Sequence, residues 1–240
     1  MVKNHPIALI TGGSRGIGAA IARELAPTHR LIIGGRTAES VATVTALYED
    51  ATGFIADLAD PVTIENAVSA LEIDRLDVLV HSAGLLGSSK PVAETSLAEW
   101  QQVMGVNVIA VAQLTRLLLP ALRNAGGQVI MINSGSGLKA SAGTSVYSSS
   151  KFALRALADS LREEERGRIR VTSIHSGRVA TDMQVQLQAN AGRAYVASDH
   201  LQPESVAAAV RLAVDASAEA MVETISVRPI VTMVSGKSLK

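Results

Sequence analysis

The chain has 240 residues, of which 48% are hydrophobic and 18% charged, a balance typical of a compact globular protein and not of a disordered chain. Its 22 basic and 22 acidic side chains cancel, so no net field attracts nucleic acid or an anionic membrane surface. No cysteine is present, which excludes disulfides, thiol chemistry and cysteine-bound metal. We expect a cytoplasmic protein, because the first apolar run, residues 7–10, is too short for a signal peptide.

A glycine-rich turn follows the first predicted strand, Ile7 to Ile10. The turn reads Thr-Gly-Gly-Ser-Arg-Gly-Ile-Gly over residues 11–18, and a helical pattern continues from Ala19 to Ala26. Glycines let the backbone approach a pyrophosphate, and the start of a helix offers unpaired N–H groups. Strand, glycine turn and helix in this order predict a dinucleotide-binding site, with a merely tight turn as the alternative.

The residues after the second predicted strand favour NADP(H) over NAD(H). This strand, Leu31 to Ile33, ends in Gly34-Gly35-Arg36. An acidic residue near this point binds the ribose hydroxyls of NAD, whereas an arginine accommodates the 2′-phosphate of NADP. The chain has Arg36 and no acid there, and Arg15 in the glycine turn supplies a second cation. Either arginine could also be an ordinary solvated side chain.

An aspartate follows the third predicted strand, at the carboxyl end of that strand. A helical pattern from Thr37 to Leu47 precedes a short strand, Gly53 to Ala56, which Asp57 and Leu58 close. Asp57 can accept a hydrogen bond from an adenine amino group, or form an ordinary Asx turn. A helix follows from Pro61 to Leu71.

The fourth strand ends in small residues. It runs from Asp77 to His81 and is followed by Ser82-Ala83-Gly84, which permits close approach of a cofactor. His81 faces either the core or the edge of the cleft, and we do not expect it to be catalytic.

A long helix from Ser96 to about Asn124 comes next, with Ser96 as its N-cap. Its apolar stretch from Val103 to Leu122 contains polar side chains and Pro120, so we interpret it as a helix buried by protein and not as a membrane span. Asn107 lies on the apolar face, where its amide is satisfied structurally or serves catalysis.

The strongest chemical signal is Ser134 together with Tyr147 and Lys151. Ser134 ends the apolar run from Val129 to Ile132 and so lies at the carboxyl end of a buried strand, where ligands collect in α/β sheets. Tyr147 and Lys151 are four residues apart in a helical pattern, one turn apart on one face. An ammonium about 4 Å from a phenol favours the phenolate, before burial subtracts its share.

The remaining chain completes the alternation of strands and helices. A strand from Arg170 to Ile174 leads into a mixed segment, about residues 180–202, which we interpret as a lid or substrate wall. A helix from Glu204 to Ala216 and a strand from Thr224 to Val227 follow.

These features resemble the short-chain dehydrogenase/reductase family over nearly the whole chain. The resemblance implies an α/β fold in which residues 1–240 form a single domain with a Rossmann fold. This fold is a doubly wound, seven-stranded parallel sheet with helices on both faces, usually assembled as a homotetramer and sometimes as a homodimer. The resemblance rests on Thr11-Gly12-x-x-x-Gly16-x-Gly18, Asp57, Ala83-Gly84, Asn107, Ser134 and Tyr147-x-x-x-Lys151.

The resemblance also implies roles for individual residues. Tyr147 would donate a proton to a carbonyl or accept one from an alcohol, and Lys151 would lower the pKa of Tyr147 and hold the nicotinamide ribose. Ser134 would bind the substrate oxygen, and Asn107 would position a water that connects Lys151 to solvent. Val179 and Thr181 match positions that hold the nicotinamide carboxamide. The cofactor-binding positions would be Gly12, Ser14, Arg15, Gly16, Ile17, Gly18, Arg36, Asp57, Leu58, Ala83, Gly84, Tyr147, Lys151, Gly177, Val179 and Thr181.

Three stretches depart from the common family pattern. Residues 81–84 read His-Ser-Ala-Gly where Asn-Asn-Ala-Gly is common, and residues 176–177 read Ser-Gly where Pro-Gly is common. The last strand ends in Val-Arg-Pro, residues 227–229, and lacks a Gly-Gly pair. None of these changes touches the four catalytic positions.

The function implied is an NADP(H)-dependent transfer of hydride between the nicotinamide and a carbonyl or secondary alcohol of a small organic substrate. One alternative is an NADP-binding regulator or scaffold without turnover, and another is epimerisation or dehydration on the same scaffold. The sequence does not name the substrate. Side chains that could form an apolar wall or attract an anion are Met183, Val185, Leu187, Tyr195, Arg178 and Arg193.

Overall fold

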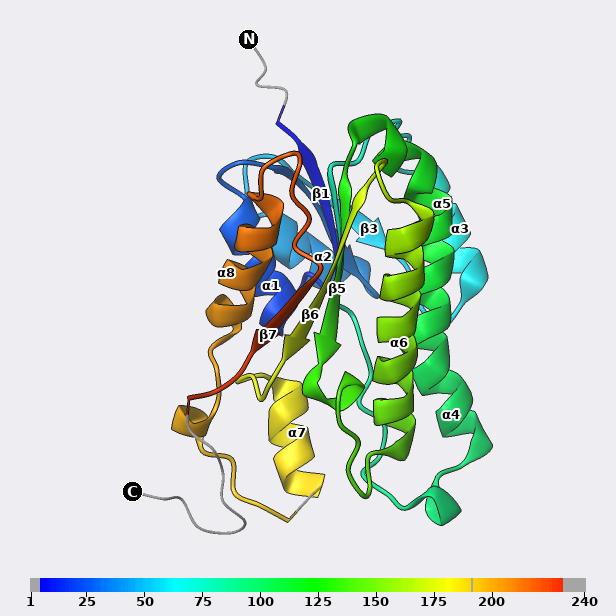
Figure 1. The fold of residues 1–240 in the computed structure, drawn as a ribbon, viewed down its shortest axis with the longest axis vertical. Helices are drawn as coiled ribbons and strands as arrows, with labels where there is room; N and C mark the ends of the chain where they lie inside the picture. Colours follow the sequence, from blue (N-terminus) through cyan, green and yellow to red (C-terminus); the bar gives the residue numbers. More distant parts are fainter. Residues whose placement is uncertain (1–4, 191, 231–240) are drawn as a thin grey trace.

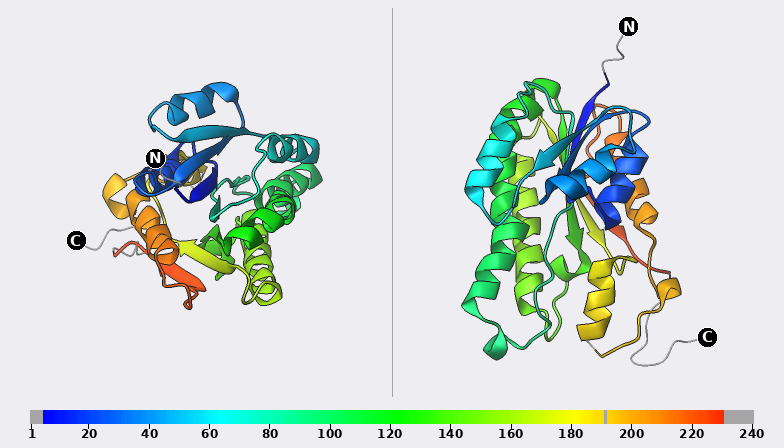
Figure 2. Two further views of the ribbon diagram at one scale, coloured as in Figure 1. Left: turned by 90° about the horizontal axis from the view of Figure 1, so that it is seen from above. Right: turned by 180° about the vertical axis from the view of Figure 1, so that it is seen from behind.

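The architecture is a single twisted sheet between two layers of helices (Figures 1 and 2). The computed structural model describes residues 5–190 and 192–230. In these residues seven parallel strands pair in the order β3-β2-β1-β4-β5-β6-β7, which confirms the seven-stranded parallel sheet that the family resemblance implies. The strands are β1 (Ile7–Thr11), β2 (Arg30–Gly35), β3 (Ala51–Ile55), β4 (Val78–His81), β5 (Gln128–Ser134), β6 (Arg170–Ser176) and β7 (Thr224–Val227).

Helices cover both faces of this sheet. Helices α1, α2 and α8 lie on one face, and α3, α4, α5 and α6 on the other (Figure 1). The helices are α1 (Gly16–Leu25), α2 (Ala38–Thr45), α3 (Pro61–Ser69), α4 (Leu97–Met104), α5 (Ala110–Ala125), α6 (Ser145–Glu164), α7 (Asp182–Asn190) and α8 (Pro203–Val214). Four short helical segments are η1 (Val92–Glu94), η2 (Gly105–Ile109), η3 (Gly135–Gly137) and η4 (Ala197–Asp199).

Alternation along the strands divides the core into two clusters. In β1, Ala8 and Ile10 pack with α1 and α8, whereas Leu9 between them packs with α5 and α6. Successive side chains of a strand point to opposite faces, so a strand covered on both sides reads as a continuous apolar run. This explains why the short runs of Val, Ile and Leu were sufficient to locate the strands.

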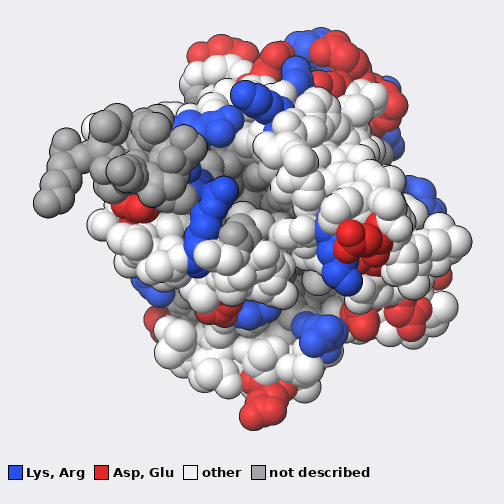
Figure 3. Space-filling view, turned by 90° about the horizontal axis from the view of Figure 1, so that it is seen from below, with Lys and Arg blue, Asp and Glu red and all other residues white. Residues whose placement is uncertain are grey.

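The strand order reverses between β1 and β4, which pair directly. The chain builds outward from β1 through β2 to β3 and then returns to place β4 on the other side of β1. Connections leave the two strands toward opposite faces, so a crevice opens outside their carboxyl ends. In Figure 1 the strands point downward, and the view from below in Figure 3 shows a hollow at this edge with basic side chains beside it.

The long helix predicted from Ser96 to about Asn124 is continuous but irregular. Its N-cap is confirmed, because the Ser96 side chain accepts a hydrogen bond from the backbone N–H of Glu99. One π-helical turn, η2, separates α4 from α5. The run Leu97–Ala125 has the length and composition of a membrane span. One face of this run, however, packs in the second core cluster through Val111, Leu114, Leu118 and Leu122.

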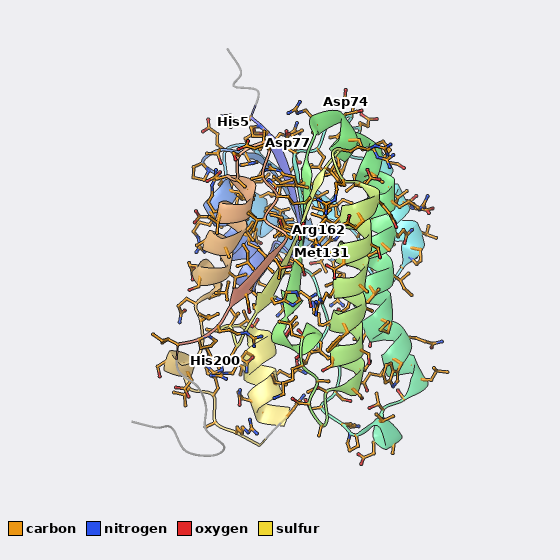
Figure 4. The ribbon with its side chains drawn as sticks, in the orientation of Figure 1. His5, Asp74, Asp77, Met131, Arg162 and His200 are labelled. Atoms are coloured by element: carbon orange, nitrogen blue, oxygen red, sulfur yellow. The ribbon has the colours of Figure 1, made fainter. Side chains whose placement is uncertain are left out.

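A buried arginine fixes α6 to the sheet (Figure 4). Arg162, 5% exposed, donates to the backbone oxygens of Val171 and Glu223 at 3.0 Å each and to Asp159 at 2.8 Å. Val171 belongs to β6 and Glu223 precedes β7, so one guanidinium joins the helix to two strands. Because α6 also carries Tyr147 and Lys151, these contacts set the position of both side chains relative to the strand ends.

The segment of residues 180–202 was predicted as a mixed segment that forms a lid or substrate wall, and no helix was predicted in it. Residues Asp182–Asn190 form α7. The helix buries Gln184 and Gln188, one turn apart, and leaves Val185 45% exposed. Because its inward face is polar, α7 lacks the apolar periodicity by which a helix is recognised in sequence.

Candidate active site

A groove of about 560 Å³ runs along the carboxyl ends of β1 to β4 and meets the start of α7. It collects most of the predicted cofactor positions. Those lining it are Gly12, Ser14, Arg15, Gly16, Ile17, Gly18, Arg36, Asp57, Leu58, Ala83, Gly84 and Thr181. The groove is also lined by residues that were not predicted as cofactor contacts, among them Thr11, Gln102, Asp182 and Met183.

The glycine turn has the backbone shape that the sequence predicts. Gly12 and Gly16 have φ values of 62° and 54°, in the left-handed region that disfavours side chains. A Cβ at Gly18 would lie 2.2 Å from the carbonyl oxygen of Gly12. Helix α1 begins at Gly16 with no side-chain cap. Its first N–H groups therefore remain available to a phosphate.

Thr11 ties this turn to the end of β4. Its hydroxyl oxygen accepts hydrogen bonds from the backbone N–H groups of Ser82 and Ala83, at 3.1 and 3.2 Å, and donates to Val80. The two segments therefore keep a fixed spacing across the switch point between β1 and β4. In the sequence, the only sign of this contact is the threonine that begins the glycine motif. The role of its hydroxyl follows from the register of β1 against β4, which the sequence does not give.

The two arginines predicted to bind a 2′-phosphate lie in different surroundings. Arg36 is exposed at the end of β2 and lines the groove. The Nη1 of Arg15 instead contacts a carboxylate oxygen of Asp182 at 2.9 Å, an ion pair between the glycine turn and α7. Arg15, predicted as a second cation for the 2′-phosphate, lines the groove and also pairs with Asp182, a partner that the sequence did not indicate. Its contact with the phosphate stays a prediction.

Asp57 makes the turn interaction that was the alternative to adenine binding. Its Oδ1 accepts a hydrogen bond from the backbone N–H of Ala59 at 2.9 Å. Its Oδ2 has no hydrogen bond to the described residues. Asp57 lines the groove, so the free oxygen keeps the predicted contact with adenine possible.

Tyr147, Lys151 and Ser134 meet where α6 crosses the end of β5. The Nζ of Lys151 donates to the carbonyl oxygen of Ile132 at 3.0 Å and lies 5.8 Å from the centroid of the Tyr147 ring. The Ser134 side chain lies close enough to the Tyr147 hydroxyl to lower its pKa. A Cβ added to Gly84 would lie 3.9 Å from the Lys151 Nζ, which places this group beside the groove. The hydroxyl groups of Ser134 and Tyr147 and the amine of Lys151 therefore lie together beside the groove.

Burial, and not Lys151, dominates the pKa of Tyr147 in this structure. Burial raises the pKa of Tyr147, and the nearby Ser134 side chain lowers it by less. Burial also lowers the pKa of Lys151 to about 8. The prediction that Lys151 lowers the pKa of the phenol assumed an ammonium at about 4 Å. Here that effect is outweighed, because both groups lose hydration and the Nζ is held by Ile132.

Lys151→Met should stabilise the fold at neutral pH. The pKa of Lys151 falls from 10.5 when unfolded to about 8 when folded, so the unfolded state binds more protons between these values and wild-type stability rises with pH there. Below pH 8 the buried ammonium costs about 3 kcal/mol, offset by about 1 kcal/mol for the hydrogen bond that methionine lacks. We expect urea unfolding to show a gain of about 2 kcal/mol at pH 7 that shrinks as the pH rises and becomes a loss of up to about 1 kcal/mol above pH 10.5, where only the missing hydrogen bond counts. A gain independent of pH would contradict this assignment.

The side chain of Asn107 is fully used within the protein. It lies in η2, where its Oδ1 accepts from the backbone N–H of Leu85 at 2.8 Å. Its Nδ2 donates to the backbone oxygen of Leu85 at 2.9 Å and to the Ser150 hydroxyl at 3.0 Å. These contacts match the structural interpretation. They also fix the segment after Gly84 against α6, beside Lys151.

His81 and two of the predicted cofactor positions, Val179 and Gly177, lie away from the groove surface. His81 is buried, forms a hydrogen bond with the Thr115 hydroxyl at 2.8 Å, and burial lowers its pKa to about 3. It is a core residue, as expected of a non-catalytic histidine. Val179 is buried in the core and pairs with Leu201. Gly177 packs against Pro229 instead of lining the groove.

The side chains predicted to form the substrate wall lie in different places. Met183 lines the groove, whereas Tyr195 packs against His200 with ring centroids 4.8 Å apart. Figure 4 shows His200 beside α7, in the segment that leads to α8. Arg178 donates to the backbone oxygen of Asp199 at 3.2 Å. The loop therefore uses several of its large side chains to hold itself together.

Comparison with known proteins finds a family model and solved structures that match most of the chain. Residues 6–192 match the family model for short chain dehydrogenase. The uncharacterized oxidoreductase YciK of Escherichia coli strain K12 is 36% identical over 196 residues, 75% of this chain and 76% of that protein. The closed form of serine dehydrogenase, complexed with NADP+, gives a TM-score of 0.86 at 25% identity over 98% of this chain and 99% of that one. An alcohol dehydrogenase from the archaeon Thermococcus sibiricus, complexed with 5-hydroxy-NADP, gives 0.85 at 25% identity over 95% and 97%.

Proposed function

Because this chain belongs to the short-chain dehydrogenase family, we propose that it is an NADP(H)-dependent oxidoreductase acting on a carbonyl or secondary alcohol of a small organic substrate. The observation that carries the proposal is the meeting of Ser134, Tyr147 and Lys151 beside the groove. An intact set of these three side chains favours turnover over a regulator that only binds the cofactor.

The groove fits a dinucleotide with a 2′-phosphate. The glycine turn and the uncapped start of α1 would hold the pyrophosphate, and Arg36 would hold the 2′-phosphate. Ala83 and Gly84 would flank the ribose on the nicotinamide side, near Lys151. Serine dehydrogenase, complexed with NADP+, and the archaeal alcohol dehydrogenase, complexed with 5-hydroxy-NADP, have the same fold, which supports this choice of cofactor. When bound, the nicotinamide supplies or accepts the hydride.

The residues of this chain would handle the proton and orient the substrate. Tyr147 would donate its hydroxyl proton to the carbonyl oxygen during reduction and accept it back during oxidation. Ser134 would hold the same oxygen by a hydrogen bond, so the carbonyl carbon faces the cofactor. Lys151 would hold the ribose and favour the tyrosinate by its charge. Asn107, through Leu85 and Ser150, would keep this part of the site rigid and position a water that leads to Lys151.

The proposal is tested by calorimetry with NADPH and NADH, followed by NADPH oxidation with a panel of ketones, aldehydes and quinones. We expect tight binding of NADPH and turnover of at least one carbonyl class. Tight binding without turnover over the whole panel would favour the regulator. Failure to bind either cofactor would contradict the assignment of the groove.

We further propose a cytoplasmic homotetramer, with a homodimer as the smaller alternative. Large apolar side chains on the helical layer support self-association: Leu97, Ile109 and Phe152 are 73%, 60% and 42% exposed. Light scattering coupled to gel filtration should give four times the mass of the chain. A monomer at micromolar concentration would contradict the proposal.

A further inference from the structure

A closed ring of buried hydrogen bonds lies behind Ser134. The backbone N–H of Ser134 donates to Asn133 Oδ1 at 2.8 Å, and Asn133 Nδ2 contacts Ser173 Oγ at 3.5 Å. Ser173 Oγ contacts His175 Nε2 at 3.2 Å, and His175 Nδ1 contacts the carbonyl oxygen of Ser134 at 3.1 Å. Asn133, Ser173 and His175 are each at most 2% exposed. The ring therefore starts and ends on the backbone of one residue.

The chemistry of the atoms fixes the direction of every bond in the ring. A carbonyl oxygen can only accept, so His175 Nδ1 carries a proton and donates it to Ser134. The amide nitrogen Nδ2 of Asn133 can only donate, so it donates to the Ser173 hydroxyl. A neutral imidazole with a proton on Nδ1 has an unprotonated Nε2, so the Ser173 hydroxyl donates to it. All four donors then point the same way around the ring.

The ring is also joined to the backbone of Lys151 and to the side chain of Ser176. Asn133 Nδ2 donates to the backbone oxygen of Lys151 at 3.2 Å, and Ser176 Oγ donates to the backbone oxygen of Asn133. A Cβ on Gly137 would lie 2.7 Å from Asn133 Oδ1 and 2.8 Å from the Lys151 oxygen. The turn after Ser134 therefore packs directly onto the ring, and β5, β6 and α6 meet there.

We propose that His175 is a positioning residue for Ser134. It acts by holding the carbonyl oxygen of Ser134 while Asn133 holds the N–H, so the hydroxyl stays aimed at Tyr147 and the substrate oxygen. This inference rests on the proposed function, because it gives His175 a role in that reaction. His175 does not touch the reacting atoms.

The surroundings of His175 keep it neutral. Burial lowers the pKa of His175, and so do Arg155 of α6 and Arg228 after β7, whereas the bond to Ser134 and the charge of Asp159 raise it by less. A second proton on Nε2 would face the Ser173 hydroxyl and reverse that bond. The ring as described therefore persists at neutral pH and above, and protonation would disturb it only in acid.

Two amide variants separate the two nitrogen atoms of the imidazole. The amide nitrogen of asparagine takes the place of Nδ1, whereas that of glutamine takes the place of Nε2. We expect His175→Asn to keep kcat within about threefold of wild type, and His175→Gln and His175→Ala to lose about tenfold, one hydrogen bond's worth. The KM for NADPH should not change in any of them. Equal losses in all three variants, or losses in KM alone, would overturn the positioning role.

A measurement without turnover tests the ring itself. Long-range proton–nitrogen correlation by NMR on wild-type protein distinguishes the two neutral tautomers of a histidine. We expect the proton of His175 on Nδ1 at pH 7.5, and a proton on Nε2 alone would overturn the proposal whatever the variants do. The Nδ1 tautomer in a protein that turns over no carbonyl would instead mean that the proposed function fails. Thermal unfolding of each variant confirms that the comparison is between folded proteins.

Discussion

Tyr147→Phe should lower kcat by about a thousandfold or more while the dissociation constant for NADPH changes by less than about threefold. Phenylalanine keeps the ring that packs in this buried position but has no proton to give to the carbonyl oxygen. It also removes the hydroxyl that lies close to the Ser134 side chain. The loss should therefore fall on the chemical step and leave binding in the groove intact.

Steady-state kinetics and a fluorescence titration with NADPH measure the two quantities on the same preparation. Tyr48→Phe is the matched control, since Tyr48 is a half-buried tyrosine that packs against the first core cluster and does not line the groove. We expect it to keep wild-type kcat. Turnover of Tyr147→Phe within tenfold of wild type would refute Tyr147 as the proton donor.

Arg36→Ala should weaken NADPH binding by about 10- to 100-fold and NADH binding by less than about twofold. A charge-assisted hydrogen bond to a phosphate contributes about 1.5 to 3 kcal/mol. NADH has no 2′-phosphate, so it makes no such bond with Arg36 and loses none in the variant. Arg36 lines the groove at the end of β2. No ion pair with a described residue competes for its guanidinium.

Arg15→Ala provides a sharp comparison, because Arg15 is held by Asp182. If this pair persists with cofactor bound, its loss should affect NADPH less than the loss of Arg36 does. Arg116→Ala, on the outer side of α5 and paired with Glu65, should change neither affinity. Equal weakening of NADPH and NADH by Arg36→Ala, measured by calorimetry, would remove the 2′-phosphate assignment.

The strands and the glycine turn could be predicted from the sequence because both depend on short-range patterns, whereas the assembly of the strands into one seven-stranded parallel sheet was implied by the family resemblance. Buried parallel strands appear as apolar runs, and the glycine turn between Thr11 and Gly18 needs backbone shapes that only glycine adopts readily. The turn predicted at Asp57 as an alternative also follows from local chemistry, since an aspartate bonds its own neighbours. Such features can be predicted from the sequence because each depends on only a few neighbouring residues.

The features that sequence reasoning missed all depend on contacts between distant segments. The pair of Arg15 and Asp182 joins residues 167 positions apart, and no local pattern marks it. Helix α7 was missed because it turns glutamines inward. The ring around His175 needs the register that places Asn133 beside His175 on adjacent strands. The pKa of Tyr147 depends on the balance of burial and charge, which spacing alone cannot give.

The most direct test follows a deuterium label from C4 of NADPH into the product, with any carbonyl that the wild-type protein reduces. The proposed mechanism predicts that mass spectrometry finds one deuterium on the former carbonyl carbon with wild-type protein, and almost none with Tyr147→Phe in the same time. NADPH binding without label in any product, over the whole panel of carbonyls, would contradict hydride transfer at this site.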